Sequence, residues 1–330
     1  MDVTLLSTGG TIASTDGDGG KTPSKAGEEL IDAVPELADL ASFTVERVAS
    51  VSGFDVTWDR AAAIRRAAER AAQESDGIVV THGTDTMAES AYLLDLTTAL
   101  GVPVAFTGAQ RPFDEVGTDG PPNLLAAART VAHERAESRT YLVFDDEIHA
   151  PRDVVKSHTS ALSTFCSPER GPVGEFTPAG LRLFREPRSY ADGAPEVGEV
   201  GAEIPILTSG LGVNGDTLRR VVGDPADPAV DAVVVAGTGL GNTTGSLCEA
   251  IEEIRAAGIP VAIASRCHEG ATAPLYGGPG GATTLDDLGV LWAGDLPAWK
   301  ARIKLAVALA VGGDGADEAF FERGLREPGR

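Results

Sequence analysis

Two short loops concentrate the residues of this chain that could bind or transform a small molecule. Residues 7–13 read Ser-Thr-Gly-Gly-Thr-Ile-Ala and residues 81–87 read Thr-His-Gly-Thr-Asp-Thr-Met, and each loop follows a short apolar run that predicts a buried strand. In open α/β sheets, ligands bind outside the carboxyl ends of the strands. Successive glycines also let main-chain N–H groups approach a ligand closely. We therefore expect both loops to lie at one edge of a sheet and to form a site.

Each loop taken alone also has a structural explanation. Residues 7–13 can be a tight turn, and they are not a phosphate-binding Walker loop, because no Lys-Ser/Thr pair follows. The polar residues 84–86 can cap a helix that starts near Met87, and His82 can be a structural histidine. Capping accounts for one of these polar residues but not for the whole cluster, which favours a functional interpretation.

The elements that must position these loops alternate between strands and helices. In the first half of the chain, apolar runs predict strands, and segments of helical periodicity lie between them. The predicted strands are 3–6, 77–81, 102–107 and 140–144, and the predicted helices are 58–75, 87–100 and 123–136. A second series has strands near 204–208, 232–236, 261–264 and 290–292, with helices near 243–257 and 297–310. This alternation predicts an α/β protein with parallel sheets covered by helices.

The length of 330 residues is enough for two domains, since single cores rarely grow beyond about 250 to 300 residues. Residues 185–195 are polar, rich in helix breakers and without periodicity. We therefore expect a larger N-terminal parallel-sheet domain of residues 1–185, which carries the catalytic loops, a linker of residues 186–203, and a smaller C-terminal α/β domain of residues 204–330.

The charge balance bears on partners and on solubility. A formal net charge of −22 would repel phosphate backbones, so no nucleic-acid partner is expected. Arginine supplies most of the positive charge, because the lysines are limited to Lys21, Lys25, Lys156, Lys300 and Lys304. An acidic, lysine-poor surface is typical of proteins that stay soluble in concentrated salt, which leads to the hypothesis of a halophilic protein.

The sequence gives no sign of a membrane segment, a metal site or a cofactor. No apolar run approaches the ~18 residues that cross a bilayer. The first strand begins almost at Met1 with no signal peptide before it, so we expect a cytoplasmic protein. Cys166, Cys248 and Cys267 are odd in number and lack C-x-x-C spacing, which argues against a disulfide framework and a structural zinc site. The Cys267-His268 pair is better explained by an ordinary thiol than by a metal ligand.

Together the two loops make this sequence resemble the asparaginase family. The Thr-Gly-Gly-Thr-Ile of residues 8–12 and the His-Gly-Thr-Asp-Thr-Met of residues 82–87 are the two signatures of that family, in the same order. Further matches are residues 108–112, 119–121, 123–124, 152–156 and 237–242, so the resemblance spans nearly the whole chain. It implies a bacterial-type, cytoplasmic asparaginase with haloarchaeal-like composition, which forms a homodimer or homotetramer and hydrolyses L-asparagine, with possible side activity on glutamine.

The resemblance also implies catalytic roles for four residues. Thr11 would attack the carboxamide carbon and form an acyl-enzyme ester, which water then hydrolyses to aspartate. Thr84 and Lys156 would form a polar triad with Asp85, in which the ammonium favours deprotonation of the threonine hydroxyl. Asp85 would in addition receive the α-ammonium group of the substrate. A single lysine usually lies on the surface without a specific role. Lysine is scarce in this chain, however, and Lys156 falls in an Arg-Asp-x-x-Lys stretch that matches the family pattern.

Substrate contacts follow from the same resemblance. Backbone N–H groups near Thr84 and Ala109 would stabilise the oxyanion, and Ser52 is the expected contact of the substrate carboxylate. Asn242 would complete the site of a neighbouring subunit, although an asparagine in so glycine-rich a loop can also hold a turn with positive φ. The predicted substrate-binding residues are Gly10, Ser52, Gly53, Gly83, Ala109 and Asn242.

Two features of the family pattern are missing. Many members have a tyrosine on the loop after the first signature that contacts the nucleophile, but here Lys21 or Thr22 falls near that position. The tyrosines of this chain, Tyr92, Tyr141, Tyr190 and Tyr276, all lie elsewhere. The glutamate that some secreted members supply from a partner chain has no counterpart in residues 272–286. The route by which the Thr11 proton leaves is therefore open.

Two other functions remain as alternatives. One is the asparaginase-like subunit that supplies ammonia to a tRNA-dependent amidotransferase, and such subunits carry an N-terminal extension, whereas here Thr8 lies near the start. The other is a non-catalytic amino-acid-binding module, which would be expected to lose Thr11, Thr84, Asp85 or Lys156. All four are present, and release of ammonia by the purified chain without tRNA or ATP would separate these functions.

Overall fold

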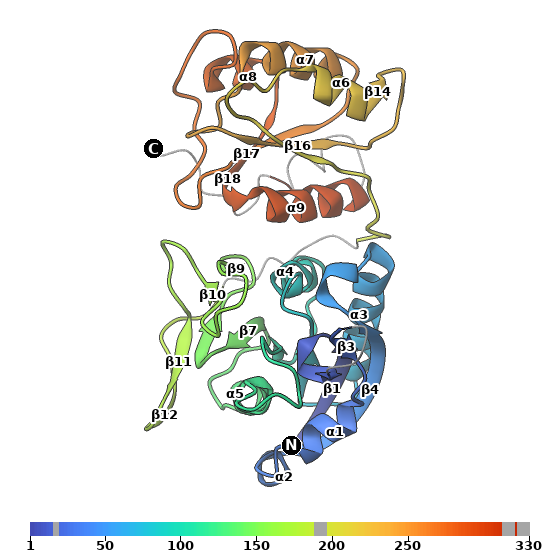
Figure 1. Ribbon diagram of the computed structural model, residues 1–330, viewed down its shortest axis with the longest axis vertical. Helices are drawn as coiled ribbons and strands as arrows, with labels where there is room; N and C mark the ends of the chain where they lie inside the picture. The colour runs from blue at the N-terminus through green and yellow to red at the C-terminus, as the bar shows by residue number, and fades with distance from the viewer. Residues whose placement is uncertain (16–19, 188–196, 312–320, 322–330) are drawn as a thin grey trace. The chain divides into compact units, whose positions relative to one another are not determined.

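The computed structural model describes residues 1–15, 20–187, 197–311 and 321. The chain divides into two compact units, Met1–Ala194 and Pro195–Arg330 (Figure 1). The central part of the predicted linker, residues 188–196, lies outside the described residues. The linker of residues 186–203 and the domain bounds on either side of it therefore stay a prediction.

The N-terminal unit is built on an eight-stranded sheet in the order β12-β11-β8-β7-β6-β5-β1-β4. Its parallel part comprises β1 (Asp2–Gly9), β4 (Ser42–Val51), β5 (Gly77–Thr81), β6 (Val104–Thr107) and β7 (Thr140–Phe144). Its antiparallel part comprises β8 (Glu147–His149), β11 (Gly174–Thr177) and β12 (Gly180–Leu183). The prediction of an α/β fold with a mostly parallel N-terminal sheet is confirmed.

The central strands are buried on both faces because alternate apolar side chains enter two different cores. In β5, Val79 packs in one core with α1 (Gly27–Asp32), α2 (Leu37–Leu40) and α5 (Gly120–Val131), while Ile78 and Val80 pack in the other. The second core contains residues of α3 (Trp58–Ala71) and α4 (Met87–Thr97). Helices thus cover both faces of the sheet and leave the carboxyl ends of its parallel strands to the loops.

The boundaries of several elements differ from those predicted. Helix α5 begins at Gly120 and ends at Val131, whereas residues 123–136 were expected, because the prolines after Gly120 occupy its first turn, where a missing N–H costs nothing. Strand β6 begins at Val104 because Pro103 has no N–H for the ladder. Helices α3 and α4 end a few residues earlier than expected, at Ala71 and Thr97.

Short elements of the N-terminal unit carry part of the first signature loop, the segment after β4 and the Lys156 segment. The 3₁₀ turn η1 (Thr11–Ala13) follows β1, and β2 (Ser14–Thr15) then pairs with β3 (Thr22–Pro23). The 3₁₀ turn η2 (Gly53–Asp55) follows β4. Strands β9 (Val155–Lys156) and β10 (Phe165–Cys166) form an antiparallel pair.

The C-terminal unit contains a four-stranded parallel sheet in the order β13-β16-β17-β18. Its strands are β13 (Ile206–Thr208), β16 (Val233–Gly237), β17 (Val261–Ser265) and β18 (Leu291–Pro297), and a small hairpin is formed by β14 (Gly223–Asp224) and β15 (Asp227–Pro228). Helices α6 (Asp216–Val222), α7 (Gly245–Ala256) and α8 (Ala282–Asp287) lie on one face of the sheet, and α9 (Ala298–Val311) lies on the other (Figure 1). The expected smaller α/β layout is confirmed.

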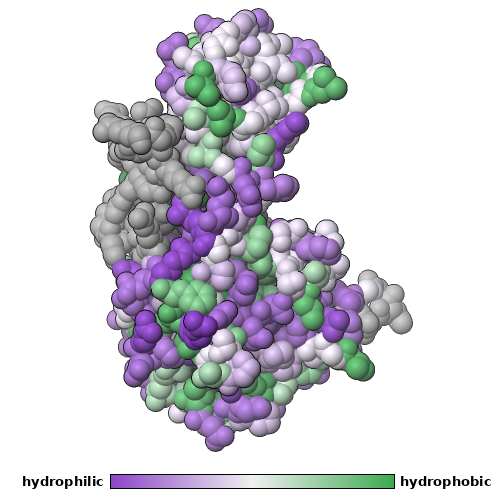
Figure 2. Space-filling model, turned by 90° about the vertical axis from the view of Figure 1, so that its left-hand side faces the viewer, coloured by the Kyte–Doolittle hydropathy of each residue, from purple (hydrophilic) through white to green (hydrophobic). Residues whose placement is uncertain are grey.

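Other global features concern the surface and the cysteines. On the face shown in Figure 2, hydrophobic residues occur in small groups among hydrophilic ones. No helix within the described residues is long and apolar enough to cross a membrane. Cys166, Cys248 and Cys267 have free thiols, and the described part of the chain holds no group of three or more His, Cys, Asp or Glu side chains suited to a metal ion.

Candidate active site

The first signature loop leaves β1 through two glycines with left-handed backbone. Gly9 has φ 99° and Gly10 has φ 79°, values that glycine adopts without a steric penalty. The N–H of Gly10 donates to the carbonyl of Val51 at 2.9 Å, which ties the loop to the end of β4. A Cβ on Gly9 would lie 2.5 Å from the Val51 nitrogen, so a side chain there would break this contact.

Three glycines from three loops bring the site together. A Cβ on Gly10 would lie 2.5 Å from the nitrogen of Gly83, and a Cβ on Gly83 would overlap the backbone of Gly53. A Cβ on Gly53 would in turn lie 2.9 Å from the carbonyl carbon of Gly83. These loops follow the adjacent parallel strands β1, β4 and β5. The close approach of their backbones places the segments that hold Thr11, Ser52 and Thr84 at one edge of the sheet.

Lys156 links the two polar residues of the second signature loop. Its ammonium group donates to the Oγ1 of Thr84 at 2.8 Å and to the Oδ1 of Asp85 at 2.7 Å. The Lys156 side chain is 17% exposed and that of Asp85 is 50% exposed, whereas Thr84 is buried. The structure therefore brings together three of the four predicted catalytic residues, with a carboxylate open to a ligand and a hydroxyl in contact with a cation.

Thr11 opens the 3₁₀ turn η1 and is half-buried. No hydrogen bond with another described residue engages its hydroxyl, which leaves that group available to a ligand. The carbonyl of Gly10, immediately before it, accepts a hydrogen bond from the Ser14 hydroxyl at 2.8 Å, and this bond fixes the turn. Thr11 is thus presented beside Gly10 at the point where the three glycines meet.

The hydroxyl of Thr86 does not cap helix α4. Thr86 occupies the N-cap position, but its side chain accepts no capping hydrogen bond from the described residues. Its hydroxyl donates instead to the carbonyl of Gly53 at 2.6 Å. The capping interpretation of this side chain is therefore wrong, and Thr86 fastens the loop after β4 to the second signature loop.

His82, within the second signature loop, is fully buried. Its Nδ1 lies 2.8 Å from the carbonyl oxygen of Gly83, and burial lowers the pKa of His82 from 6.5 to about 4, although the hydrogen bond to Gly83 opposes this shift. The neutral ring donates its Nδ1–H to Gly83. Because C=O and N–H point in opposite directions across a trans peptide, this bond turns the N–H of Thr84 away from the histidine. The contact with Gly83 thus agrees with the interpretation of His82 as a structural histidine.

Ala109 follows β6 and is fully buried. Asn123 donates from Nδ2 to the carbonyl of Gly108 at 3.0 Å, and both oxygens of Asp119 accept from the N–H of Gln110, at 3.1 and 2.9 Å. Asp119 and Asn123 therefore hold the loop that contains Ala109. Their matches to the family pattern were noted in the sequence, but their role as loop supports becomes visible only in the structure.

The two remaining predicted positions, Ser52 and Asn242, lie in different units. Ser52 directly follows β4, next to Gly53, and is half-buried. Asn242 belongs to the C-terminal unit, where its Oδ1 accepts from the N–H of Ala282 at 3.0 Å. Positive φ values in its loop belong to Gly239 and Gly241, at 51° and 105°, and not to Asn242. The positive-φ explanation of Asn242 is therefore wrong.

The position of the family's loop tyrosine lies on the β2–β3 hairpin, of which residues 16–19 are outside the described residues. Lys21 forms an ion pair with Glu115 at 3.5 Å, and Thr22 is an exposed residue of β3. Tyr92 and Tyr141 are buried, and Tyr190 lies outside the described residues. No tyrosine of the described N-terminal unit is thus exposed for a role at the site.

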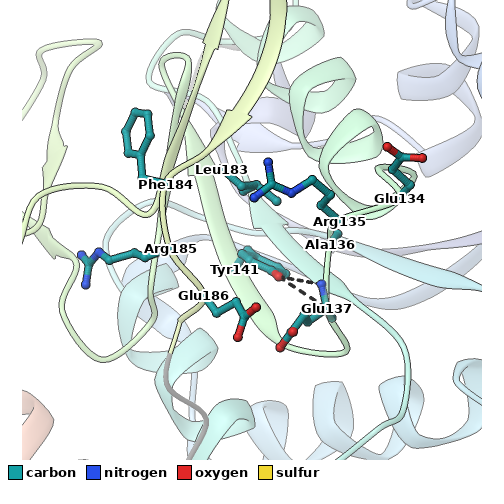
Figure 3. Close-up of a pocket in the computed structure, with 9 residues that line it drawn as sticks. All are labelled: Glu134, Arg135, Ala136, Glu137, Tyr141, Leu183, Phe184, Arg185 and Glu186. Carbon is teal, nitrogen blue, oxygen red and sulfur yellow. Dashed lines mark hydrogen bonds between the residues drawn. The ribbon is translucent and has the colours of Figure 1, made fainter.

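A separate open pocket of about 390 Å³ lies at the β12 end of the N-terminal sheet (Figure 3). Tyr141 lies at its base, where its hydroxyl accepts from the N–H of Glu137 at 3.1 Å and donates to the carbonyl of the same residue at 3.4 Å. Burial raises the pKa of Tyr141 to about 12. None of the predicted site residues lines this pocket, so it does not belong to the candidate site.

Comparisons with known proteins give a consistent result. Two family models match this chain, "Asparaginase, N-terminal" over residues 2–189 and "Glutaminase/Asparaginase C-terminal domain" over residues 203–319. L-asparaginase 2 of Escherichia coli (strain K12) is 33% identical over 320 residues, covering 93% of this chain and 88% of that protein. A glutamyl-tRNA(Gln) amidotransferase subunit of Haloquadratum walsbyi is 32% identical over 322 residues, covering 93% of this chain and 71% of that protein.

A solved structure is similar over nearly its full length. It is that of a probable cytoplasmic L-asparaginase from Campylobacter jejuni, with a TM-score of 0.85 and 28% sequence identity. The similarity covers 97% of this chain and 98% of the other chain. The likeness therefore includes both units and their connection in sequence.

Proposed function

The chain belongs to the asparaginase family, and on this premise we propose that it hydrolyses the side-chain amide of L-asparagine to give L-aspartate and ammonia. The observation that carries the proposal is the ammonium group of Lys156, which lies 2.8 Å from the Thr84 hydroxyl and 2.7 Å from the Asp85 carboxylate. The glycine contacts join this group to the loop of Thr11. Hydroxyls, a carboxylate and a cation are the groups that an amide hydrolysis through an ester requires.

In the proposed reaction Thr11 is the nucleophile. Its hydroxyl oxygen attacks the carboxamide carbon, the C–N bond breaks, and the NH2 group leaves as ammonia with the proton that the hydroxyl has lost. Water then hydrolyses the ester between Thr11 and the aspartyl group, which releases aspartate and restores the Thr11 hydroxyl. Lys156 stabilises negative charge that develops on the Thr84 oxygen, because an ammonium within hydrogen-bond distance favours the deprotonated form of a hydroxyl. The free hydroxyl of Thr11 and the engaged hydroxyl of Thr84 suit these different roles.

The same site offers groups for each polar part of asparagine. The half-exposed carboxylate of Asp85 would receive the α-ammonium group, and Ser52, beside Gly53, would contact the α-carboxylate. The oxyanion would accept hydrogen bonds from two backbone N–H groups. One is the N–H of Thr84, which points away from His82, and the other is the N–H of Ala109. Gly10, Gly53 and Gly83 contribute backbone to the site and have no side chains that would fill the space for the substrate. We expect the reaction to need no metal or other cofactor.

Several finer properties belong to the same proposal. Glutamine differs from asparagine by one methylene group, so a side activity on glutamine is expected, and the name of the matching C-terminal family model includes glutaminase. We expect a homodimer or homotetramer in which Asn242 serves a neighbouring subunit. A cytoplasmic location is supported by the similar protein from Campylobacter jejuni, and the net charge of −22 supports a halophilic protein.

The ammonia-supplying subunit of an amidotransferase is the second candidate, favoured by the similarity to the amidotransferase subunit of Haloquadratum walsbyi. The first candidate is favoured by the family models named asparaginase and by similar proteins named L-asparaginase, such as those of Escherichia coli and Campylobacter jejuni. The purified chain should therefore act on free asparagine without tRNA or ATP.

The decisive experiment measures ammonia release from L-asparagine and from L-glutamine, at low salt and in molar KCl. Thr11→Ala should lose at least about a thousandfold in kcat, the scale of removing a nucleophile. Thr44→Ala, on the exposed side of β4, is the matched control and should keep full activity. A Thr11→Ala variant that keeps more than about a tenth of the activity would remove Thr11 from this role. Full activity at low salt would contradict the halophilic hypothesis.

A further inference from the structure

The side chain of Gln110 joins the Thr84 hydroxyl to the loop between β9 and β10. Its Nε2 donates to the carbonyl of Ala161 at 3.2 Å, and its Oε1 accepts from the Oγ1 of Thr84 at 3.4 Å. The backbone of Gln110 is itself fixed, since its N–H donates to Asp119. The amide thus lies half-buried between two anchored partners.

Hydrogen-bond stoichiometry decides which way the Thr84 hydroxyl points. An ammonium group only donates, so the Thr84 oxygen accepts from Lys156. The proton of Thr84 needs an acceptor, and within the described residues that acceptor is the Oε1 of Gln110. Exchanging the oxygen and nitrogen of the Gln110 amide would break its hydrogen bond to Ala161. The carbonyl oxygen of Ala161 can only accept, so it needs the Nε2 of Gln110 as its donor. Gln110 therefore presents an oxygen to Thr84 and no hydrogen.

The carbonyl of Ala161 is held in place by its own loop. The Nδ1 of His158 accepts from the N–H of Ser160 at 3.1 Å and from the N–H of Ala161 at 2.9 Å. The loop closes where the N–H of Ser157 donates to the carbonyl of Thr164 at 2.7 Å. Because this loop begins directly after Lys156, it positions both the cation that Thr84 accepts from and the carbonyl that orients Gln110.

We propose that Gln110 is a positioning residue for Thr84. In the resting site the Oε1 of Gln110 accepts a hydrogen bond from the Thr84 hydroxyl. Lys156 donates to one lone pair of the Thr84 oxygen, and the second lone pair stays free to accept a hydrogen bond from a reactant in the site. Without Gln110 the proton can rotate toward the site and block that lone pair. This assignment rests on the proposed function, because its effect is on the reaction that Thr84 assists.

The test compares Gln110→Leu and Gln110→Glu with the wild type in steady-state ammonia release from L-asparagine. Leucine removes the acceptor, so kcat should fall about tenfold, the scale of one lost hydrogen bond, with KM changed less than about twofold. Glutamate keeps an acceptor for Thr84 but cannot donate to Ala161, and it should retain most of the kcat. Gln73, exposed in the turn after α3, is the only other glutamine, so Gln73→Leu is the matched control and should equal the wild type.

The outcomes separate this assignment from its premise. An inactive wild type refutes the proposed function and this assignment together, whereas an active wild type with an unchanged Gln110→Leu refutes this assignment alone. Equal loss of kcat in Gln110→Leu and Gln110→Glu also overturns it, because then the bond to Ala161 is what matters. A thermal unfolding scan of both variants shows whether their folded fractions are comparable, and kcat is calculated per folded chain.

Discussion

Acidification should destabilise the N-terminal unit through His82. This side chain is fully buried, and its pKa is lowered from 6.5 to about 4 by burial. Between about pH 4 and pH 6.5, His82 therefore binds a proton in the unfolded chain but stays neutral in the folded chain. Since the folded pKa lies below the unfolded one, the stability is fully present above about pH 6.5 and is lost as the pH falls toward about 4.

The size of this effect follows from the two pKa values. At about pH 4.5 the unfolded histidine is almost fully protonated and the folded one is mostly neutral, so linkage gives a loss of about 2.5 kcal/mol relative to about pH 7. His82→Asn removes the titration and keeps a donor near Nδ1 for the Gly83 carbonyl. The free-energy difference between wild type and variant should therefore shrink by about 2.5 kcal/mol between these pH values.

Urea-induced unfolding, followed by circular dichroism at both pH values, measures this double difference. Other titrating groups change both proteins equally and cancel. His133→Gln, which removes a partly exposed imidazole at a surface turn, reports the effect of losing a histidine elsewhere. If the wild type and His82→Asn lose stability in parallel on acidification, His82 does not carry the pH dependence and the reasoning from its burial is refuted.

Three further perturbations address the rest of the site. Lys156→Met should lower kcat at least about a hundredfold with little change in KM, because the lysine is assigned to activating Thr84 and not to holding the substrate; an unchanged kcat with a raised KM in steady-state assays would make it a binding residue. Gly83→Ala should cost about 2 kcal/mol or more in urea unfolding, because its methyl group would overlap Gly53, whereas Gly277→Ala, in open space, should be neutral. Refolding Thr11→Ala with Asn242→Ala should restore roughly a quarter of the wild-type activity if two-fold pairing creates the site, and no recovery despite exchange of chains would show that Asn242 does not serve a neighbour.

The alternation of apolar runs was enough to predict the parallel core, because strands such as β5 are buried on both faces and read as continuous hydrophobic segments. The antiparallel extension β8-β11-β12 was not predicted. Its first turn is formed by Asp145 and Asp146 with φ values of 48° and 63°, and two aspartates are a weaker hairpin signal than Asn-Gly. Strand β12 has only 4 residues, so its alternation of exposed and half-buried side chains is too short to predict a strand.

For the site, the resemblance indicated Thr84, Asp85 and Lys156, and the structure adds the distances between them. What no spacing could reveal is how loops far apart in the chain meet. The hydrogen bond from Thr86 to Gly53 and the amide bridge of Gln110 join residues 33 and 51 positions apart. Such contacts depend on the order of strands in the sheet, which local sequence does not encode.

The contact among Gly10, Gly53 and Gly83 also makes the site sensitive to strand register. The three glycines meet only when β4 and β5 flank β1 in the observed alignment, in which Leu6 faces Glu46 on one side and Val80 on the other. A slip of either neighbour by one residue moves its glycine about 3.3 Å along the strand and reverses the faces of all its side chains. A chain with misaligned strands therefore cannot form the site, and recovered activity after refolding would count only molecules whose central strands have paired correctly.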